Sequence, residues 1–363
     1  MARVRELAYF QGGWHNRNVT ADAAAPAASS GSRLAGFPVA SGDPRVYYLA
    51  SAGHMRELAY FQGGWHTRDL TADAGAPAAS SGTALAGFPD TVGDTRVYYI
   101  ASGLVRELAY FQNTWHNSAV VGDAGPPPVA GSPLAAFPLG DPRVYYRASG
   151  DGVRELTFVP DTRPGPPSGE WQNRNITGDA GAPPVGANSA LTAFPNTVNG
   201  DPRVYYVDLA NHIQELAYFQ DNWHHRDITA DAGAPAVADG SALAGFPVGV
   251  SGHPRVYYVD PASHVQELAY FQDNWHHRDI TADAGAPAAA ARSVLAAFRV
   301  AGSDPRVYYL GPGGGVRELA HFQNGWHHRN VTADSGAPDP GQLSPGLIGF
   351  RVGLSDPRVY YLD

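Results

Sequence analysis

Short apolar and aromatic runs alternate with polar turns along the whole chain. One representative stretch contains residues 34–37 (LAGF), 45–49 (RVYYL), 55–61 (MRELAYF) and 65–71 (WHTRDLT). Runs of this length, rich in aromatic and β-branched side chains and bounded by Gly, Asp and Pro, are typical of β-strands. No 3.6-residue periodicity predicts a helix in these segments. The pattern therefore predicts four short strands in each such stretch.

The same stretch recurs through the chain at intervals of about 50 residues. Its markers are the Arg of the RVYY run, the Glu of the following run, and a Trp eight residues after that Glu. Each marker occurs seven times: Arg45, Arg96, Arg143, Arg203, Arg255, Arg306, Arg358; Glu6, Glu57, Glu107, Glu155, Glu215, Glu267, Glu318; and Trp14, Trp65, Trp115, Trp171, Trp223, Trp275, Trp326. In the fourth copy an insertion moves the Trp further from its Glu. Seven four-stranded copies predict an all-β fold, a seven-bladed β-propeller that forms one domain over residues 1–363.

The order of the runs at the two ends of the chain predicts a closed ring. The chain enters at a third strand (residues 4–7, VREL) and ends at a second strand (residues 358–362, RVYYL). Pairing the N- and C-terminal strands in one blade would cover both sheet edges, whereas an open solenoid would expose them. The fourth copy carries the insertion at residues 164–167 (PGPP), which predicts a lengthened surface turn.

Composition and charge narrow the function classes. The formal net charge is −9 and no basic run occurs, which argues against nucleic acid as a partner. The absence of cysteine excludes disulfides and thiolate metal sites, and no apolar run is long enough to insert into a membrane. Adjacent histidines such as His224 and His225 should point to opposite strand faces, so we predict no metal and no cofactor. No signal peptide is visible, so we expect a soluble protein, either unsecreted or secreted and trimmed; the localisation stays open.

Six copies pair an Arg with a Glu that lies 11 or 12 residues further on, such as Arg45 with Glu57. Neighbouring antiparallel strands would place the two side chains together, and Arg358 would meet Glu6 on closure of the ring. An Arg fork beside two carboxylate oxygens suits the vicinal hydroxyls of a sugar, and Trp or Tyr rings suit its apolar C–H face. Structural ion pairs and packing between blades remain an alternative explanation of both features.

The RVYY run, the following turn, the REL run and the aromatic-plus-Trp segment together resemble the fucose-specific lectins of the Aleuria type and their short bacterial relatives. The resemblance covers essentially the whole chain, although that family usually has six copies and this chain has seven. It implies a sugar held between neighbouring blades by the Arg and Glu of one blade. The aromatic residue three positions after the next blade's Glu, together with that blade's Trp, would complete the pocket.

Carried onto this sequence, the resemblance implies seven such pockets. Five follow the pattern: Arg45, Glu57, Tyr110 and Trp115; Arg143, Glu155, Tyr218 and Trp223; Arg203, Glu215, Tyr270 and Trp275; Arg306, Glu318, Tyr9 and Trp14; and Arg358, Glu6, Tyr60 and Trp65. Two depart from it: Arg96 and Glu107 face Phe158 and Trp171, and Arg255 and Glu267 face His321 and Trp326. We expect these two to be weaker or altered.

The sequence thus predicts a multivalent, non-enzymatic lectin for L-fucose or related deoxy or methylated sugars, with glycans or glycoconjugates as partners. A protein-binding scaffold is the main alternative. A glycan hydrolase is less favoured because catalysis needs unique acids in one blade, whereas these carboxylates recur with the fold. The oligomeric state is not predicted.

Overall fold

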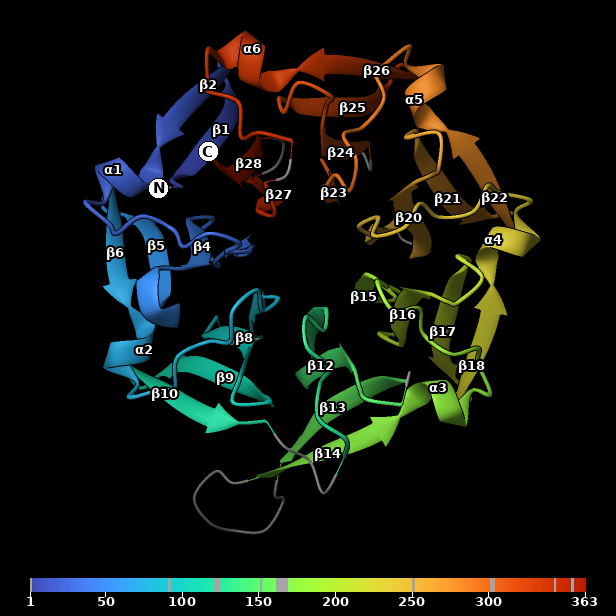
Figure 1. Cartoon of the computed structure of the whole chain (residues 1–363), viewed down its shortest axis with the longest axis horizontal. Coiled ribbons are helices and arrows are strands. Elements are labelled where there is room, and N and C mark those ends of the chain that lie inside the picture. Colours follow the sequence, from blue (N-terminus) through green and yellow to red (C-terminus); the bar gives the residue numbers. More distant parts are fainter. Residues whose placement is uncertain are drawn as a thin grey trace.

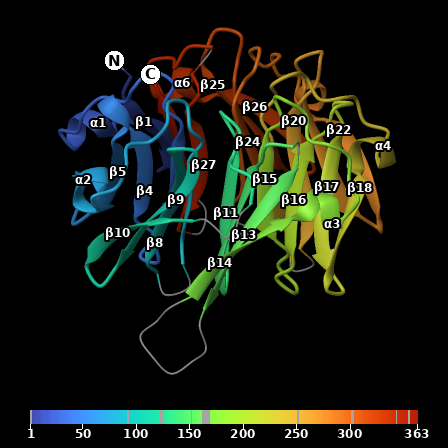
Figure 2. The same ribbon diagram turned by 60° about the horizontal axis from the view of Figure 1, so that its bottom comes forward.

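The computed structural model describes residues 2–90, 93–120, 125–150, 152–160, 169–249, 252–300, 304–342, 344–353 and 356–363. Seven antiparallel four-stranded sheets stand around a central axis, as Figure 1 and the tilted view in Figure 2 show. The predicted seven-bladed β-propeller is confirmed. The insertion expected at residues 164–167 lies outside the described residues.

We number the blades by the order of their Glu in the sequence. Blade 1 contains β27 (Leu347–Val352), β28 (Asp356–Leu362), β1 (Val4–Phe10) and β2 (Gly13–Asn18). Blade 2 contains β3 (Leu34–Pro38), β4 (Pro44–Leu49), β5 (Met55–Phe61) and β6 (Gly64–Asp69). Blade 3 contains β7 (Ala86–Pro89), β8 (Thr95–Ala101), β9 (Leu104–Phe111) and β10 (Thr114–Ala119). Blade 4 contains β11 (Leu134–Leu139), β12 (Asp141–Arg147), β13 (Val153–Pro160) and β14 (Gly169–Asn175). Blade 5 contains β15 (Leu191–Pro195), β16 (Pro202–Val207), β17 (Ile213–Phe219) and β18 (Asn222–Asp227). Blade 6 contains β19 (Ala244–Val248), β20 (His253–Val259), β21 (Val265–Phe271) and β22 (Asn274–Asp279). Blade 7 contains β23 (Leu295–Arg299), β24 (Pro305–Leu310), β25 (Val316–Phe322) and β26 (Gly325–Asn330).

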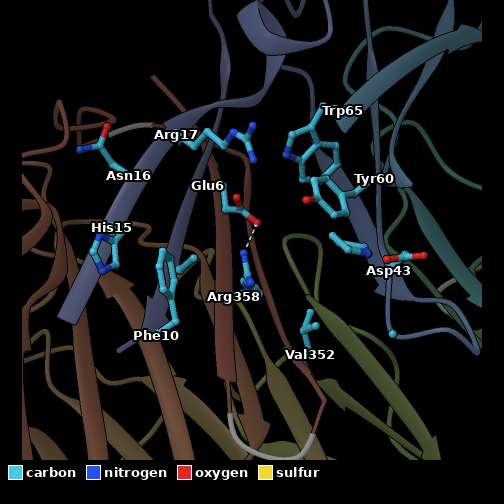
Figure 3. A pocket seen from close by; sticks show the side chains of 13 residues that line it. Glu6, Phe10, His15, Asn16, Arg17, Asp43, Tyr60, Trp65, Val352 and Arg358 are labelled. Atoms are coloured by element: carbon cyan, nitrogen blue, oxygen red, sulfur yellow. Dashed lines mark hydrogen bonds and ion pairs between the residues drawn. The ribbon is translucent and has the colours of Figure 1, made fainter. Parts of the chain in front are cut away.

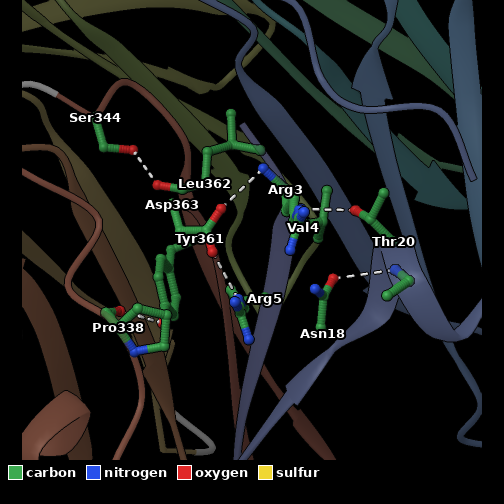
Figure 4. Close-up of polar contacts among 11 residues, drawn as sticks. Arg3, Val4, Arg5, Asn18, Thr20, Pro338, Ser344, Tyr361, Leu362 and Asp363 are labelled. Carbon is green, nitrogen blue, oxygen red and sulfur yellow. Dashed lines mark hydrogen bonds and ion pairs between the residues drawn. The ribbon is translucent and has the colours of Figure 1, made fainter. Parts of the chain in front are cut away.

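Blade 1 closes the ring as the sequence predicted. Strand β1 pairs with β28, so that Val4 lies opposite Leu362 and Ala8 opposite Arg358. Polar contacts reinforce this seam (Figure 4): Arg5 Nε donates to Asp363 Oδ2 at 2.7 Å, and the Arg3 backbone N–H donates to Asp363 Oδ1 at 3.0 Å. Neither β1 nor β28 is therefore left as a sheet edge.

The third and fourth strands of six blades are joined by two-residue hairpin loops. In blade 2 these residues are Gln62 and Gly63, with φ of 51° and 78°. Two successive positive φ values define a type I′ turn, whose twist matches that of the flanking strands. The tight turn fixes the register, so that Tyr60 lies opposite Trp65.

The hydrophobic core lies between the blades rather than within them. One cluster joins Val46, Tyr48, Leu58 and Trp65 of blade 2 to Tyr360 of blade 1. Each cluster draws on both neighbours because a strand sends alternate side chains to its two faces. The second Tyr of each RVYY run serves this packing: its hydroxyl donates to a Pro carbonyl of the crossover loop at 2.5–2.9 Å in all seven blades.

One expectation from the sequence is wrong in detail. The run at residues 65–71 was expected to be a strand throughout, but β6 ends at Asp69 and a one-turn helix begins at Leu70. Asp69 caps this helix by accepting from the backbone N–H of Ala72, which favours helix over strand. Equivalent helices are α1 (Val19–Asp22), α2 (Leu70–Asp73), α3 (Ile176–Asp179), α4 (Ile228–Asp231), α5 (Ile280–Asp283) and α6 (Val331–Ser335). A 3-10 turn covers Ser51–Gly53. Across the described ranges, no helix is long and apolar enough to span a bilayer.

Candidate functional site: seven clefts between blades

One face of each blade carries a row of three polar side chains, because strand register places them side by side. In blade 2, Tyr47, Glu57 and Arg68 lie opposite one another on the second, third and fourth strands. Arg45 precedes Tyr47 by two residues and so occupies the same face. The Arg and Glu singled out from the sequence are thus neighbours on one surface, as expected, and two further polar residues accompany them.

The Glu of this row is buried, and in five blades both a Tyr and an Arg donate to it. The seven Glu side chains are buried, with 3–8% of each residue exposed. The first Tyr of each RVYY run donates its hydroxyl to Oε1 of the Glu at 2.6–2.9 Å in all seven blades. In five blades the Arg also donates to the same oxygen at 2.5–2.9 Å. Among the described residues, Oε2 receives a hydrogen bond in blade 3 alone, from Ser118.

Burial and charge fix the protonation states of this row. Burial, and then the neighbouring carboxylate Glu215, raise the pKa of Tyr205 well above its usual value, so its phenol stays a donor. Burial is the largest single influence on Arg203 and by itself would lower its pKa, but the charge of Glu215, the neighbouring Tyr205 and the hydrogen bond to Glu215 together raise it. The guanidinium therefore stays charged while 25% of its side chain remains exposed.

Two blades hold the Arg differently. Arg45 Nε lies 3.7 Å from Glu57 Oε1, and Arg306 Nη1 lies 3.6 Å from Glu318 Oε1, so both ion pairs are looser than the other five. Both guanidinium groups instead lie over a Phe ring, at 5.9 Å from the Phe61 centroid for Arg45. Burial dominates at Glu57 and raises the pKa of this carboxyl, with the Arg45 charge acting in the opposite direction.

The next blade supplies the opposite wall of each cleft. We number each cleft by the blade that carries its Glu. In cleft 1, between blades 1 and 2, Tyr60 and Trp65 face Glu6 and Arg358, with Arg17 beside them (Figure 3). The Trp ring packs edge-on against the Tyr that holds the Glu, with centroids 6.1 Å apart for Trp65 and Tyr360. Equivalent Trp–Tyr contacts occur in clefts 3, 5, 6 and 7 at 6.2–6.5 Å.

The structure brings the predicted residues together from neighbouring blades in every cleft. Hollows lined by Arg, Glu and the next blade's Tyr occupy cleft 1, cleft 5 and cleft 7, with volumes of about 360, 380 and 620 Å³. In clefts 2 and 4, Tyr110 and Tyr218 pack in one cluster with Trp115 or Trp223 and the Glu-holding Tyr of the preceding blade.

The two departures also lie where the sequence indicated. Phe158 and Trp171 form the far wall of cleft 3, and Trp171 contacts Tyr98, which holds Glu107. In cleft 6, His321 contacts Trp326 with ring centroids 5.4 Å apart. Burial lowers the pKa of His321, with the charges of Glu267 and Arg255 acting in opposite directions.

Sequence reasoning missed two members of each site. The first is the Glu-holding Tyr, whose role is visible only once strand register is known. The second is the Arg of the fourth strand, which lies opposite the Glu and over the next blade's Tyr; Arg68 lies 5.8 Å from the Tyr110 centroid. Arg17, Arg226 and Arg329 line the three hollows. The sequence does carry a signal for this fourth-strand Arg: an Arg stands three residues after the Trp in six copies, and blade 3 has Ser118 at that position.

The paired histidines divide between two faces, as the alternation of strand side chains predicts. His224 stacks on Phe219 at 3.9 Å between centroids, whereas His225 Nδ1 lies 2.9 Å from the Ala180 carbonyl of the preceding blade. Within the described ranges no group of three or more His, Asp and Glu residues is arranged to hold a metal ion.

Comparisons with known proteins agree with this geometry. A family model described as fungal fucose-specific lectin matches residues 1–244. No curated protein matches the sequence. Among solved structures, the six-bladed lectin of Aleuria aurantia is 20% identical, with a TM-score of 0.57 over 85% of this chain and 98% of that one. The BP39L lectin of Burkholderia pseudomallei is 16% identical, with a TM-score of 0.65 over 88% and 89%. SapL1, solved in complex with alpha methyl fucoside, is 22% identical, with a TM-score of 0.56 over 84% and 96%.

Proposed function

The chain belongs to the family of fungal fucose-specific lectins, and from this premise we propose that it binds L-fucose, or a related deoxy or methylated sugar, in the clefts between its blades. A lectin binds glycans without cleaving them, so family membership assigns carbohydrate binding and not hydrolysis.

The observation that carries the proposal is the half-satisfied carboxylate found in six of the seven clefts, cleft 3 being the exception among the described residues. In cleft 5, Oε1 of Glu215 accepts from Tyr205 and Arg203, while Oε2 receives no hydrogen bond from the described residues. The carboxylate oxygens that lack a protein donor are not among the fully buried atoms, so a ligand or water in the cleft can reach them. Vicinal hydroxyls of a pyranose could donate to Oε2 and accept from the guanidinium, forming charge-assisted hydrogen bonds.

The opposite wall supplies the apolar complement. Tyr270 and Trp275 of blade 6 form an edge-to-face pair with centroids 5.6 Å apart. Such rings suit the C–H face of a pyranose and the methyl group of a 6-deoxy sugar. Six of the seven indole N–H groups are buried without a partner in the described residues, and a sugar oxygen could accept from them: Trp14, Trp65, Trp115, Trp223, Trp275 and Trp326.

Repetition would turn weak sites into strong attachment. Several identical clefts on one rigid ring can raise avidity for a glycan-coated surface by about 10²–10⁴ without any new contact. We therefore propose a multivalent lectin that attaches to fucosylated glycoconjugates.

The test is a glycan array followed by calorimetric titration of methyl α-L-fucoside. Selective binding of fucosylated glycans, competed by free L-fucose, with more than one site per chain is the expected result. Binding of a different sugar would retain the clefts and discard the fucose assignment. A folded protein that leaves the array blank would show that the Arg–Glu rows only join strands.

A further inference from the structure

A second repeated feature lies beside the Arg–Glu rows and has no part in the proposed sugar site. The Phe that ends the third strand stacks on the His that follows the Trp, because the two are diagonal neighbours on the same face of the hairpin. Six blades carry this pair: Phe10 and His15, Phe61 and His66, Phe111 and His116, Phe219 and His224, Phe271 and His276, and Phe322 and His327.

The pairs form flat, partly exposed platforms. Ring centroids lie 3.8–4.0 Å apart and the ring planes differ by 13–22°, so the imidazole covers one face of the phenyl ring. Four of the Phe residues keep 36–40% of their surface exposed: Phe10, Phe61, Phe219 and Phe271. A large apolar ring left exposed at the same place in successive blades is unexplained by core packing, and it suggests a surface for a ligand.

The platforms line the same hollows as the Arg–Glu rows. In cleft 1, Phe10 and His15 lie across Arg358 from Tyr60 and Trp65, as Figure 3 shows. The corresponding pairs line the hollows of clefts 5 and 7. At about 360–620 Å³ these hollows are in the range that accommodates ligands larger than one sugar ring.

A purely internal role for the Phe must also be considered. In clefts 2 and 7 the guanidinium of Arg45 or Arg306 lies over the Phe ring, which could make the Phe a support for the Arg. In the other four clefts with a platform, however, the Arg is hydrogen-bonded to its Glu. Support of the Arg therefore does not account for the pairs in these four blades.

We propose that the Phe–His pairs form a second subsite, which holds the apolar face of the sugar ring linked to the fucose in a fucosylated glycan. This rests on the proposed function, because the Arg–Glu row would hold the terminal fucose. Aromatic faces stack on pyranose rings with little regard to the position of individual hydroxyls. The platforms would thus favour a disaccharide over a monosaccharide.

Blade 4 provides an internal contrast. Val159 and Gln172 occupy the positions of the Phe and the His, with Thr157 opposite Gln172 in the strand register. Its Arg143, Glu155 and Tyr145 still form the complete hydrogen-bonded row. Cleft 4 should therefore bind the terminal sugar but give the second ring no aromatic support.

The experiment compares methyl α-L-fucoside with α-L-fucosyl disaccharides of (1→2), (1→3) and (1→6) linkage by calorimetry. For the native protein, at least one disaccharide should bind about three- to tenfold more tightly than the methyl fucoside. A sixfold variant should reduce this ratio towards one: Phe10→Ala, Phe61→Ala, Phe111→Ala, Phe219→Ala, Phe271→Ala and Phe322→Ala. Val159→Ala is the matched control and should keep the native ratio.

A second variant avoids any dependence on the folding of the sixfold one. Val159→Phe with Gln172→His builds a platform in blade 4, and a crystal of its disaccharide complex should show the second ring ordered in cleft 4, unlike the native complex. A native ratio near one for every disaccharide would overturn the subsite alone, since methyl fucoside binding would still stand. If the sixfold variant instead loses affinity equally for methyl fucoside and for the disaccharides, the Phe acts as a support for the Arg. Failure of methyl fucoside to bind the native protein would overturn both proposals.

Discussion

Clefts 1 and 3 contain the same Arg–Glu–Tyr row but treat its carboxylate differently. In cleft 1, Oε1 of Glu6 accepts from Arg358 and Tyr360, and Arg17 lies opposite Glu6 in the register. In cleft 3, Ser118 replaces that Arg and donates to Oε2 of Glu107 at 3.2 Å, so both carboxylate oxygens are occupied by protein groups.

The arginines differ as well. Arg96 of cleft 3 lies 2.9 Å from Glu107 and 3.4 Å from Asp90, so two carboxylates share it. Cleft 3 also has Phe158 where cleft 1 has Tyr60. The comparison teaches that the same Arg–Glu motif has different hydrogen-bond partners in the two clefts: its neighbours decide whether its polar groups are left open or used within the protein.

The largest expected effect comes from Glu6→Gln. A neutral amide oxygen accepts more weakly than a carboxylate, so the affinity of cleft 1 for methyl α-L-fucoside should fall by about 10- to 100-fold. Calorimetry should then count one site fewer per chain. The melting temperature should hardly change, because Gln has the same shape and still accepts from Tyr360. Glu107→Gln is the control and should leave the number of sites unchanged, while cooperative unfolding lost in Glu6→Gln would make the ion pair structural only.

A smaller effect, of opposite sign, is expected from Ser118→Arg in cleft 3. The change frees Oε2 of Glu107 and restores the fourth-strand Arg found in the other six blades. We expect the affinity of cleft 3 for methyl α-L-fucoside to rise by about tenfold, measured by calorimetry. Arg17→Ser should weaken cleft 1 correspondingly. If both exchanges leave the binding isotherms unchanged, the fourth-strand Arg has no part in the site.

The smallest effect concerns His321, which stands in cleft 6 where cleft 1 has Tyr60. Because burial lowers the pKa of His321, its contribution to stability is present above the ordinary His pKa and is lost as the pH falls through the lowered value. Between about pH 7 and about pH 5, the melting temperature of the His321→Tyr variant should therefore fall less than that of the native protein.

His328→Asn is the control for this measurement, since it removes an exposed imidazole from the same hairpin and introduces the residue found at the equivalent position 16 in blade 1. Parallel pH profiles of the native protein and His321→Tyr would show that His321 does not govern the acid response of cleft 6.

The fold was predictable because its information is repeated. Seven copies of Arg, Glu and Trp at intervals of about 50 residues indicate the number of blades, and the order of strands at the chain ends indicates closure. The pairing of Arg45 with Tyr110 across a blade boundary came from the family resemblance, and the structure places both around one cleft. The one-turn helices were missed because four residues are too few to show a helical period, although Asp69 and Ala72 have the spacing of an N-cap.

The sequence alone did not reveal the register between neighbouring strands. The Tyr47–Glu57–Arg68 row joins three strands, and no spacing along the chain shows which residues lie opposite each other. The looser Arg45 and Arg306 were equally inaccessible, because their motifs match those of the tightly paired arginines. Strand order could be inferred from pattern, whereas the partner of each carboxylate oxygen depends on atomic positions.

The closed seam gives cleft 1 a property that the other clefts lack. Arg358 and Glu6 are separated by 352 residues along the chain, yet they donate and accept the same hydrogen bond. A sugar held in cleft 1 by these two residues, as we propose, would therefore contact both ends of the chain and bind the closed ring in preference to any opened form. By mass action, sugar at one hundred times its dissociation constant would add about 2.7 kcal/mol to the free energy of opening the ring at this seam. Binding there would act as a clasp, so that the glycan that the lectin recognises also helps to keep its ring shut.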